Sequence, residues 1–310
     1  MRRSMLAALF ASVAALSCAE GQAPKQANPM MVEKVEKALP SEAPAKPKKT
    51  RNLLVFSHTA GFRHSSIELG ARTLTLMGDK TGAYTVTHTE DPSIFDTEKL
   101  KKFDAVFMLN TTNDCFRKTL PKGTKEAPEQ KSANDTEEAA RKQALYEFVQ
   151  NGGGLAGCHA ATDTYKSWKE YNLMMGGAFA SHPWHKLVPV KVLDPKNPIN
   201  AAFDGKDFEI ADEIYMFRND TALAKDRKFL LVMDTSKMSK EDVAKGKRDD
   251  GTYPISWINA SGKGRVFYCS LGHREEIYWN TAIMKHYLAG IQYTLGDLEA
   301  DATPARSSEK

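Results

Sequence analysis

Short apolar runs alternate with longer amphipathic segments along the first half of the chain. The runs are rich in Val, Leu and Phe and are followed by polar or glycine-rich residues, which is typical of buried parallel strands. They cover residues 52–57, 84–88, 104–109 and 154–158. Apolar residues recur at helical spacing over 65–77, and further helices are predicted near 96–103 and over 136–150. This alternation predicts a parallel sheet covered by helices on both faces.

The second half of the chain is richer in strand-like runs. They cover residues 187–193, 208–217, 229–233, 254–258 and 265–270, and an amphipathic helix follows over 282–295. Two Lys-rich stretches, 116–134 and 236–251, lack periodicity and predict long surface loops. We therefore expect one α/β domain over residues 51–297 with a mixed sheet.

Both ends of the chain differ from this middle part. Residues 1–23 have a basic start and a short apolar run, which predicts an export signal. Lipidation at Cys18 would make a membrane-anchored lipoprotein, whereas cleavage after Ala19 or Ala23 would release a periplasmic protein. Residues 24–50 are rich in Pro, Ala and Lys and predict a flexible tether, and residues 298–310 predict a disordered tail.

Composition and charge exclude several classes of protein. Charged residues make up 26% and hydrophobic residues 41%, which is typical of a globular domain. The net charge of +4, with both signs scattered, gives no reason to expect nucleic acid as a partner. No apolar run is long enough to span a bilayer, so we expect membrane contact only through a lipid at Cys18. Four cysteines are too few for a disulfide-built scaffold.

Polar side chains gather where the predicted strands end. In an open parallel sheet ligands bind beyond the carboxyl ends of the strands, so these residues should meet at one rim. Six of the eight histidines lie at strand ends or in nearby loops: His58, His64, His159, His182, His185 and His273. Each alone is an ordinary structural residue, but their joint placement favours a functional site.

The turn at Gly157–Ala161 has the small–X–X–X–small pattern that lifts one side chain above a sheet. The raised residue is His159, and Cys158 before it ends the apolar strand. A cysteine–histidine nucleophile is the alternative, and it requires an exposed Cys158. We expect His159 at the centre of the site, with His58, Asn110, His182, Glu213 and His273 around it.

At these residues the chain resembles the ThuA-like (trehalose utilisation) family, from about Asn52 to Gly296. The resemblance rests on segments 56–64, 109–112, 152–164, 177–183, 212–215 and 264–273, among them Gly152-Gly-Gly-Leu-Ala-Gly-Cys-His159. It implies a three-layer α/β/α sandwich of the flavodoxin and glutamine amidotransferase type, with added antiparallel strands in the second half. The family has His where an amidotransferase has its nucleophilic Cys, so glutaminase activity is not expected.

The resemblance also implies a role in carbohydrate catabolism, on a disaccharide or a 3-keto-glycoside, beside a sugar oxidoreductase. Acid–base chemistry is expected from His58, His159, Glu213 and His273. Substrate contacts are expected from Arg63, His64, Asn110, Thr111, Asp163, His182, Trp184 and Tyr215, and Trp279 is a further stacking candidate.

A divalent metal such as Zn²⁺ is a further expectation, because His159, His182, Glu213 and His273 are suitable ligand types. The alternative to an enzyme is a module that binds a sugar or a partner through a degenerate amidotransferase-like site.

Overall fold

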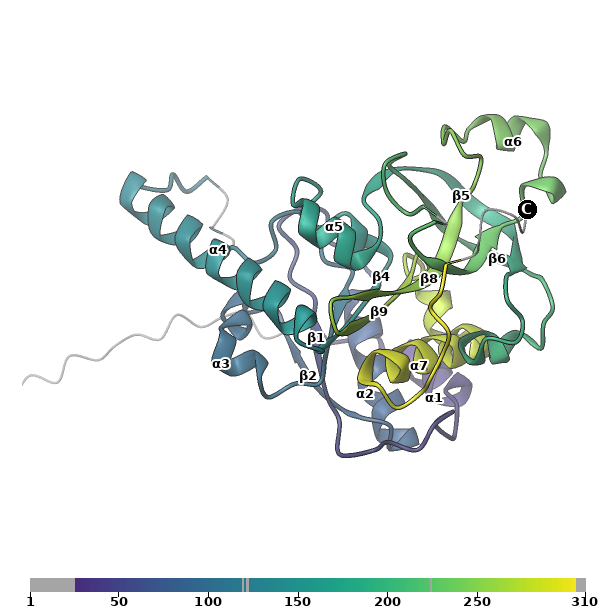
Figure 1. The fold of residues 1–310 in the computed structure, drawn as a ribbon, viewed down its shortest axis with the longest axis horizontal. Coiled ribbons are helices and arrows are strands. Elements are labelled where there is room, and N and C mark those ends of the chain that lie inside the picture. Colours follow the sequence, from purple (N-terminus) through teal and green to yellow (C-terminus); the bar gives the residue numbers. More distant parts are fainter. Residues whose placement is uncertain (1–25, 119, 121–122, 224, 305–310) are drawn as a thin grey trace, which may run out of the picture.

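The computed structural model describes residues 26–304 except 119, 121, 122 and 224. Within this part, nine strands form one sheet in the order β2-β1-β3-β4-β9-β8-β7-β5-β6 (Figure 1). The strands are β1 (Asn52–Phe56), β2 (Thr85–Thr89), β3 (Ala105–Leu109), β4 (Gly154–Cys158), β5 (Phe179–Val192), β6 (Phe208–Phe217), β7 (Lys228–Met233), β8 (Pro254–Ser261) and β9 (Gly264–Cys269).

The α-helices between the strands are α1 (Pro29–Ala38), α2 (Ile67–Thr81), α3 (Thr97–Leu100), α4 (Pro128–Gln150), α5 (Lys169–Met175), α6 (Lys240–Ala244) and α7 (Thr281–Leu295). Five short 3₁₀ segments join them within the described residues: η1 (Pro92–Phe95), η2 (His159–Thr162), η3 (Pro198–Phe203), η4 (Thr235–Lys237) and η5 (Glu275–Trp279).

The parallel half of the sheet has a helical layer on each face. Its central strands β3 and β4 are fully buried, whereas β2 at the edge is partly exposed. Strands β2, β1, β3, β4 and β9 pair in parallel, which confirms the four parallel strands predicted in the first half. Side chains alternate between the faces, so Leu53 and Val55 pack toward α1, α2 and α7, whereas Leu54 and Phe56 pack toward α3, α4 and α5. The predicted three-layer α/β/α sandwich is thereby confirmed (Figure 1).

The antiparallel half differs from the prediction at β5. This strand begins at Phe179, although a strand was predicted only from Leu187. The first residues of β5 pair irregularly with β6, with register shifts between Phe179 and Trp184. Polar His182 and His185 therefore lie on an irregular strand and not in a loop, and His185 pairs directly with Glu213 of β6.

The two predicted Lys-rich loops are also partly helical. Helix α4 starts at Pro128, a favoured first residue, and not at Thr136, and its first turns extend away from the body of the molecule (Figure 1). This part of the helix has polar side chains on all sides, so it lacks the apolar periodicity that predicts a helix. Ion pairs between successive turns, such as Lys131–Asp135, stabilise it. Residues 236–251 likewise include η4 and α6.

The N-terminal segment predicted as a flexible tether is packed where the structure describes it. Val35 of helix α1 and Leu39, directly after the helix, are buried against the core, and Lys34 Nζ lies 4.7 Å from the centre of the Trp279 ring. The composition of residues 24–50 predicted disorder, but a few apolar residues are enough to order a segment when they can pack against the apolar surface of an already folded domain. Leu298, in the predicted tail, is likewise buried. The predicted export signal and Cys18 lie outside the described residues.

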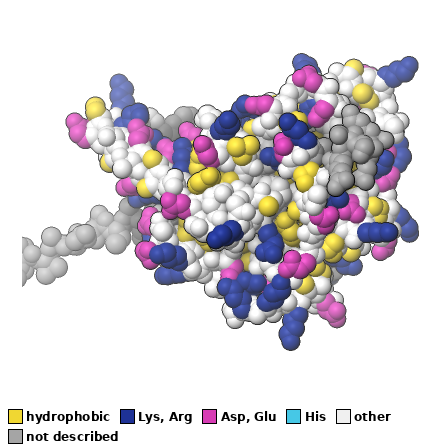
Figure 2. Space-filling model, viewed as in Figure 1, with side chains coloured by type: hydrophobic (Ala, Val, Ile, Leu, Met, Phe, Trp, Pro, Cys, Tyr) yellow, Lys and Arg dark blue, Asp and Glu magenta, His cyan; other side chains and the backbone are white. Residues whose placement is uncertain are grey.

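The surface in Figure 2 mixes Lys and Arg with Asp and Glu, without a broad area of one sign. Among the described helices, none is both long and apolar enough to cross a membrane.

The buried His286 predicts how the fold responds to acid. Its Nδ1 donates to the Ile199 carbonyl, its Nε2 contacts the Ser256 hydroxyl at 2.8 Å, and burial lowers its pKa to about 4. The unfolded chain, with an ordinary histidine pKa near 6.5, therefore binds this proton first, and stability falls as the pH drops from 6.5 toward 4.

We predict that His286 accounts for about 2 kcal/mol of unfolding free energy lost between pH 6.5 and 5. Urea titrations at both pH values should show a smaller loss for His286→Gln than for the wild type. An equal loss in the two proteins would contradict the assignment.

Candidate functional site

His159 stands at the turn between β4 and the following 3₁₀ segment. Its φ of 41° is unusual for a residue with a side chain, and its carbonyl accepts hydrogen bonds from Tyr268 and Thr162 that stabilise this conformation. Gly157 has no space for a side chain, because a Cβ there would lie 2.7 Å from the Ala161 Cβ. The predicted sharp turn is present, and it directs His159 toward β6.

Three side-chain atoms form an equilateral triangle at this turn. His159 Nε2 lies 3.3 Å from Glu213 Oε2, His273 Nδ1 lies 3.3 Å from the same oxygen, and the two nitrogens are 3.3 Å apart. Burial raises the pKa of Glu213, but the neighbouring His159 and His273 rings outweigh it and hold that pKa well below its usual range. Glu213 is therefore ionised, and its hydrogen bond raises the pKa of His273.

The tautomer of His159 follows from its second nitrogen. Nδ1 lies 2.9 Å from the Ser270 carbonyl, and a carbonyl only accepts hydrogen bonds, so Nδ1 carries a hydrogen. In a neutral ring Nε2 then presents its lone pair to the Glu213 carboxylate. Such a contact is favourable only with a second proton on the ring or a cation between the atoms. A backbone carbonyl that orients the remote nitrogen is common behind metal-binding histidines.

His64 is the fourth member of this cluster. Its ring contacts those of His159 and His273 edge to face, with centroids 4.9 and 5.3 Å away. Burial, together with the two neighbouring histidines, lowers its pKa to about 3, so the ring is neutral. Its Nδ1 is buried without a hydrogen-bond partner, which leaves a lone pair or a donor available for a ligand.

These four side chains fit a divalent metal. One ligand atom from each of His64, His159, Glu213 and His273 lies within 4.8 Å of the others. A tetrahedral zinc site with bonds of about 2.0–2.1 Å separates its ligand atoms by about 3.3–3.4 Å, which matches the triangle. The prediction named His182 in place of His64.

Asp212 positions the loop that carries His273. Its buried carboxylate accepts hydrogen bonds from the backbone N–H groups of Gly272, at 2.7 Å, and Arg274, at 2.9 Å. Because neighbouring residues of a strand point to opposite sides, Asp212 holds the loop backbone while Glu213 faces the cluster. The sequence showed Asp212 within a family motif but gave no sign of this role.

Asn110 connects three loops beneath the cluster. Its amide donates to Ser66 Oγ at 3.0 Å and to the Gly272 carbonyl at 3.1 Å, and it is fully buried at φ 48°. Asn110 was predicted to contact substrate. The structure makes it a positioning residue for the loops that carry His64 and His273.

Exposed polar side chains lie beside the second oxygen of Glu213. Oε1 is 3.3 Å from His182 Nδ1 and 4.0 Å from His185 Nδ1, and Arg274 Nε donates to His185 Nε2. We call His182, His185 and Arg274 the rim. Glu213 thus connects the buried cluster to the rim, with one oxygen on each. Tyr215 packs its ring 4.1 Å from that of His159 and is almost fully buried.

Several other predicted site residues are held elsewhere. His58 directs Nδ1 to the Cys115 carbonyl at 2.6 Å and is not part of the cluster. The Thr111 hydroxyl is buried against Thr164, and Asp163 pairs with Lys166. Trp184 was predicted to stack on a sugar, but it is 1% exposed and donates to the Asp242 carbonyl.

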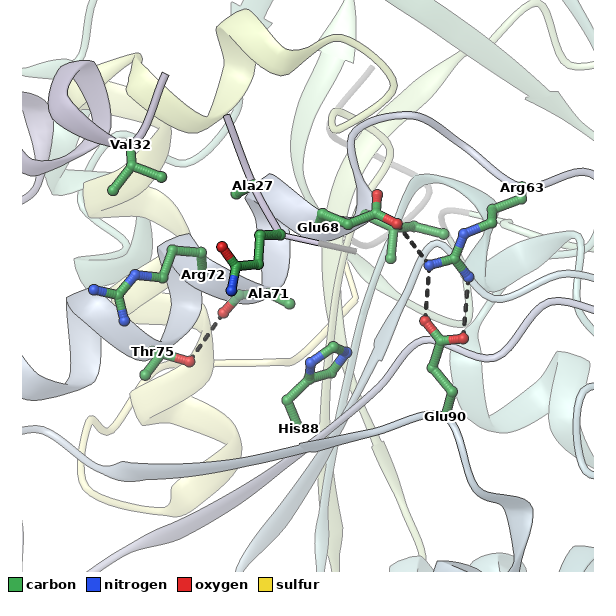
Figure 3. A pocket seen from close by; sticks show the side chains of 11 residues that line it. Ala27, Val32, Arg63, Glu68, Ala71, Arg72, Thr75, His88 and Glu90 are labelled. Atoms are coloured by element: carbon green, nitrogen blue, oxygen red, sulfur yellow. Dashed lines mark hydrogen bonds and ion pairs between the residues drawn. The ribbon is translucent and has the colours of Figure 1, made fainter. Parts of the chain in front are cut away.

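Arg63 lines a different hollow, of about 470 Å³, between α1, α2 and β2 (Figure 3). Its guanidinium is held by Glu90 and Glu68, and His88 lies in the same hollow (Figure 3). The neighbouring residues Arg63 and His64 therefore serve different places, although the sequence predicted substrate contacts for both.

Comparison with known proteins identifies the family. The ThuA model, described as trehalose utilisation, matches residues 52–294. The chain belongs to the ThuA family. No curated protein sequence matches it significantly.

Solved ThuA-like structures share the fold. A ThuA-like protein from Bacteroides uniformis ATCC 8492 is 22% identical, with a TM-score of 0.59 over 81% of this chain and 94% of that one. A ThuA-like protein from Parabacteroides merdae ATCC 43184 is 15% identical, with a TM-score of 0.56 over 82% and 93%. At these identities the likeness concerns the fold.

Cys158 of this ThuA domain is not a nucleophile. It is fully buried at the end of β4, and burial raises its pKa to about 12. A thiol acts as a nucleophile in its ionised form, so the cysteine–histidine alternative is wrong for this residue.

We predict that Asp212→Asn destabilises this ThuA domain by about 1–3 kcal/mol. The Asn side chain has one oxygen, so its NH₂ group would face the backbone N–H of either Gly272 or Arg274 and leave that donor without an acceptor. Urea unfolding measures the loss. The control is Asp204→Asn, at an exposed turn with φ 50°, where the change should stay within about 0.5 kcal/mol. Equal stability of Asp212→Asn and the wild type would contradict the positioning role.

Proposed function

We propose that this ThuA protein is a metal-assisted enzyme that acts on a sugar, with zinc held by His64, His159, Glu213 and His273. The observation that carries the proposal is the triangle of 3.3 Å distances among His159 Nε2, Glu213 Oε2 and His273 Nδ1. Carboxylate and imidazole ligands in a site of this size suit Zn²⁺. When bound, the ion supplies Lewis-acid stabilisation of a carbonyl or hydroxyl oxygen.

The proton transfers are assigned to the rim. His182 is half-exposed, and its Nδ1 contacts Glu213 Oε1, so the carboxylate orients the ring. A histidine oriented by a carboxylate is the usual arrangement of a general acid or base. Its remote nitrogen would then give a proton to, or take one from, a sugar hydroxyl or the carbon beside a carbonyl. His185, which Arg274 contacts, is a second donor or acceptor for the same substrate.

The substrate class comes from the family's link to trehalose utilisation. We propose a disaccharide or its 3-keto derivative, which a sugar oxidoreductase would supply. We also propose that residues 1–23 direct export, so that the reaction takes place in the periplasm or on a lipid anchor at Cys18.

We predict that the purified protein holds about one zinc per chain and converts a disaccharide or a 3-keto-disaccharide, and that EDTA abolishes turnover until zinc is restored. Elemental analysis and product chromatography measure the two. Glu213→Gln and His273→Ala should lose most of the metal. His182→Ala should keep it but lose turnover by about 10²-fold or more, because only the proton transfer is removed.

The matched control is His88→Ala, a histidine in the other hollow, which should retain both metal and turnover. Turnover that survives both EDTA and Glu213→Gln would overturn the metal assignment. Sugar binding without turnover under all conditions would instead support a binding module.

A further inference from the structure

Phe62 is an exposed aromatic side chain next to the cluster. In the described part of the chain, the large hydrophobic side chains left exposed are Met30, Phe62, Leu173 and Leu187, and Phe62, 68% exposed, is the aromatic one. A single exposed apolar residue needs no explanation by itself. Phe62, however, is held on a fixed loop and contacts His64 of the cluster.

The loop that presents Phe62 is fixed by Thr112. The Gly61 N–H donates to Thr112 Oγ1 at 3.1 Å, and the same hydroxyl donates to the Phe62 carbonyl at 3.0 Å. Ala60 N–H donates to the Thr112 carbonyl at 3.1 Å. A Cβ at position 61 would meet the end of the Asn113 side chain, so the two loops approach closely here. The exposed ring is therefore carried on a fixed backbone, and little order would have to be gained when a ligand packs against it.

The Phe62 ring contacts one member of the cluster directly. Its edge-to-face contact with His64 has a centroid distance of 4.8 Å, and His64 in turn contacts His159 and His273. A sugar ring packed on Phe62 would thus place its neighbouring atoms beside the cluster.

The aromatic residues predicted to stack on a sugar are less suited to this role. Trp184 and Tyr215 are 1% and 3% exposed, and Trp279 is partly buried with Lys34 of α1 over its ring. Phe179, the other candidate near the rim, is half-buried and already packs against His182 and Tyr215.

We propose that Phe62 is the stacking platform of the substrate site, where the C–H face of a pyranose ring packs while the hydroxyl groups and carbonyl of the sugar face the cluster. The inference rests on the proposed function and adds the residue that selects a ring with one apolar face. Phe62 is a specificity residue here, because it contributes contact area and no proton or metal ligand.

The test compares Phe62→Ala, Phe62→Trp and Leu173→Ala in the zinc-loaded protein. Calorimetry measures the dissociation constants of trehalose and of its 3-keto derivative, and elemental analysis measures the zinc content. Phe62→Ala should bind the sugar about tenfold more weakly with unchanged zinc. Phe62→Trp should restore binding and show a fluorescence change on sugar addition. Leu173→Ala, which removes another exposed apolar side chain, from α5, should behave as the wild type.

Two results overturn the platform while leaving the proposed enzyme in place. One is equal sugar affinity in Phe62→Ala and the wild type. The other is weaker binding that is accompanied by loss of zinc, since Phe62 would then merely support His64. If the zinc-loaded wild type binds neither sugar, the platform and the proposed substrate class both fail, although the metal site stands on its own measurement.

Discussion

The carboxylate of Glu213 lies among four imidazole rings, and the arrangement of the site depends on how this charge is compensated. Two rings face one oxygen from within the protein and two face the other from the surface. A buried anion is costly unless it is paired. Because Ser270 holds the Nδ1–H of His159, the charge facing its Nε2 is compensated either by a second proton on the ring or by a cation between the atoms. The need to compensate the charge of Glu213 links the fold to the proposed chemistry.

The sheet brings these groups together from distant parts of the chain. His159 follows β4 and His273 follows β9, neighbours in the parallel half, while Glu213 comes from β6 in the antiparallel half. Asp212 and Asn110 join the intervening loops by buried hydrogen bonds. Asp212 and Asn110 therefore hold the loops of the site in place, and His182, His185 and Phe62 are exposed side chains beside it.

Much of the fold and the centre of the site could be predicted from the sequence. Apolar runs predicted the parallel strands, and the rule that ligands lie at strand ends brought His159 and His273 together. Glu213 lies within a predicted strand and was added by the family resemblance. The exchange of His182 for His64 could not be predicted, because both follow polar loops and only the path of irregular β5 turns His182 outward. Helix α1 has apolar residues at helical spacing, but the Pro- and Lys-rich composition of residues 24–50 predicted a tether instead. The start of α4 has no apolar periodicity, and burial removed Trp184, Thr111 and Asn110 from the surface.

A crystal structure of the zinc-loaded protein, with anomalous data at the zinc edge, tests the central claim most directly. The account predicts one strong peak bonded to His159 Nε2, Glu213 Oε2 and His273 Nδ1, with His64 as the fourth protein ligand. A peak at His182 and His185 alone, or an empty cluster with His159 hydrogen-bonded directly to Glu213, would contradict it.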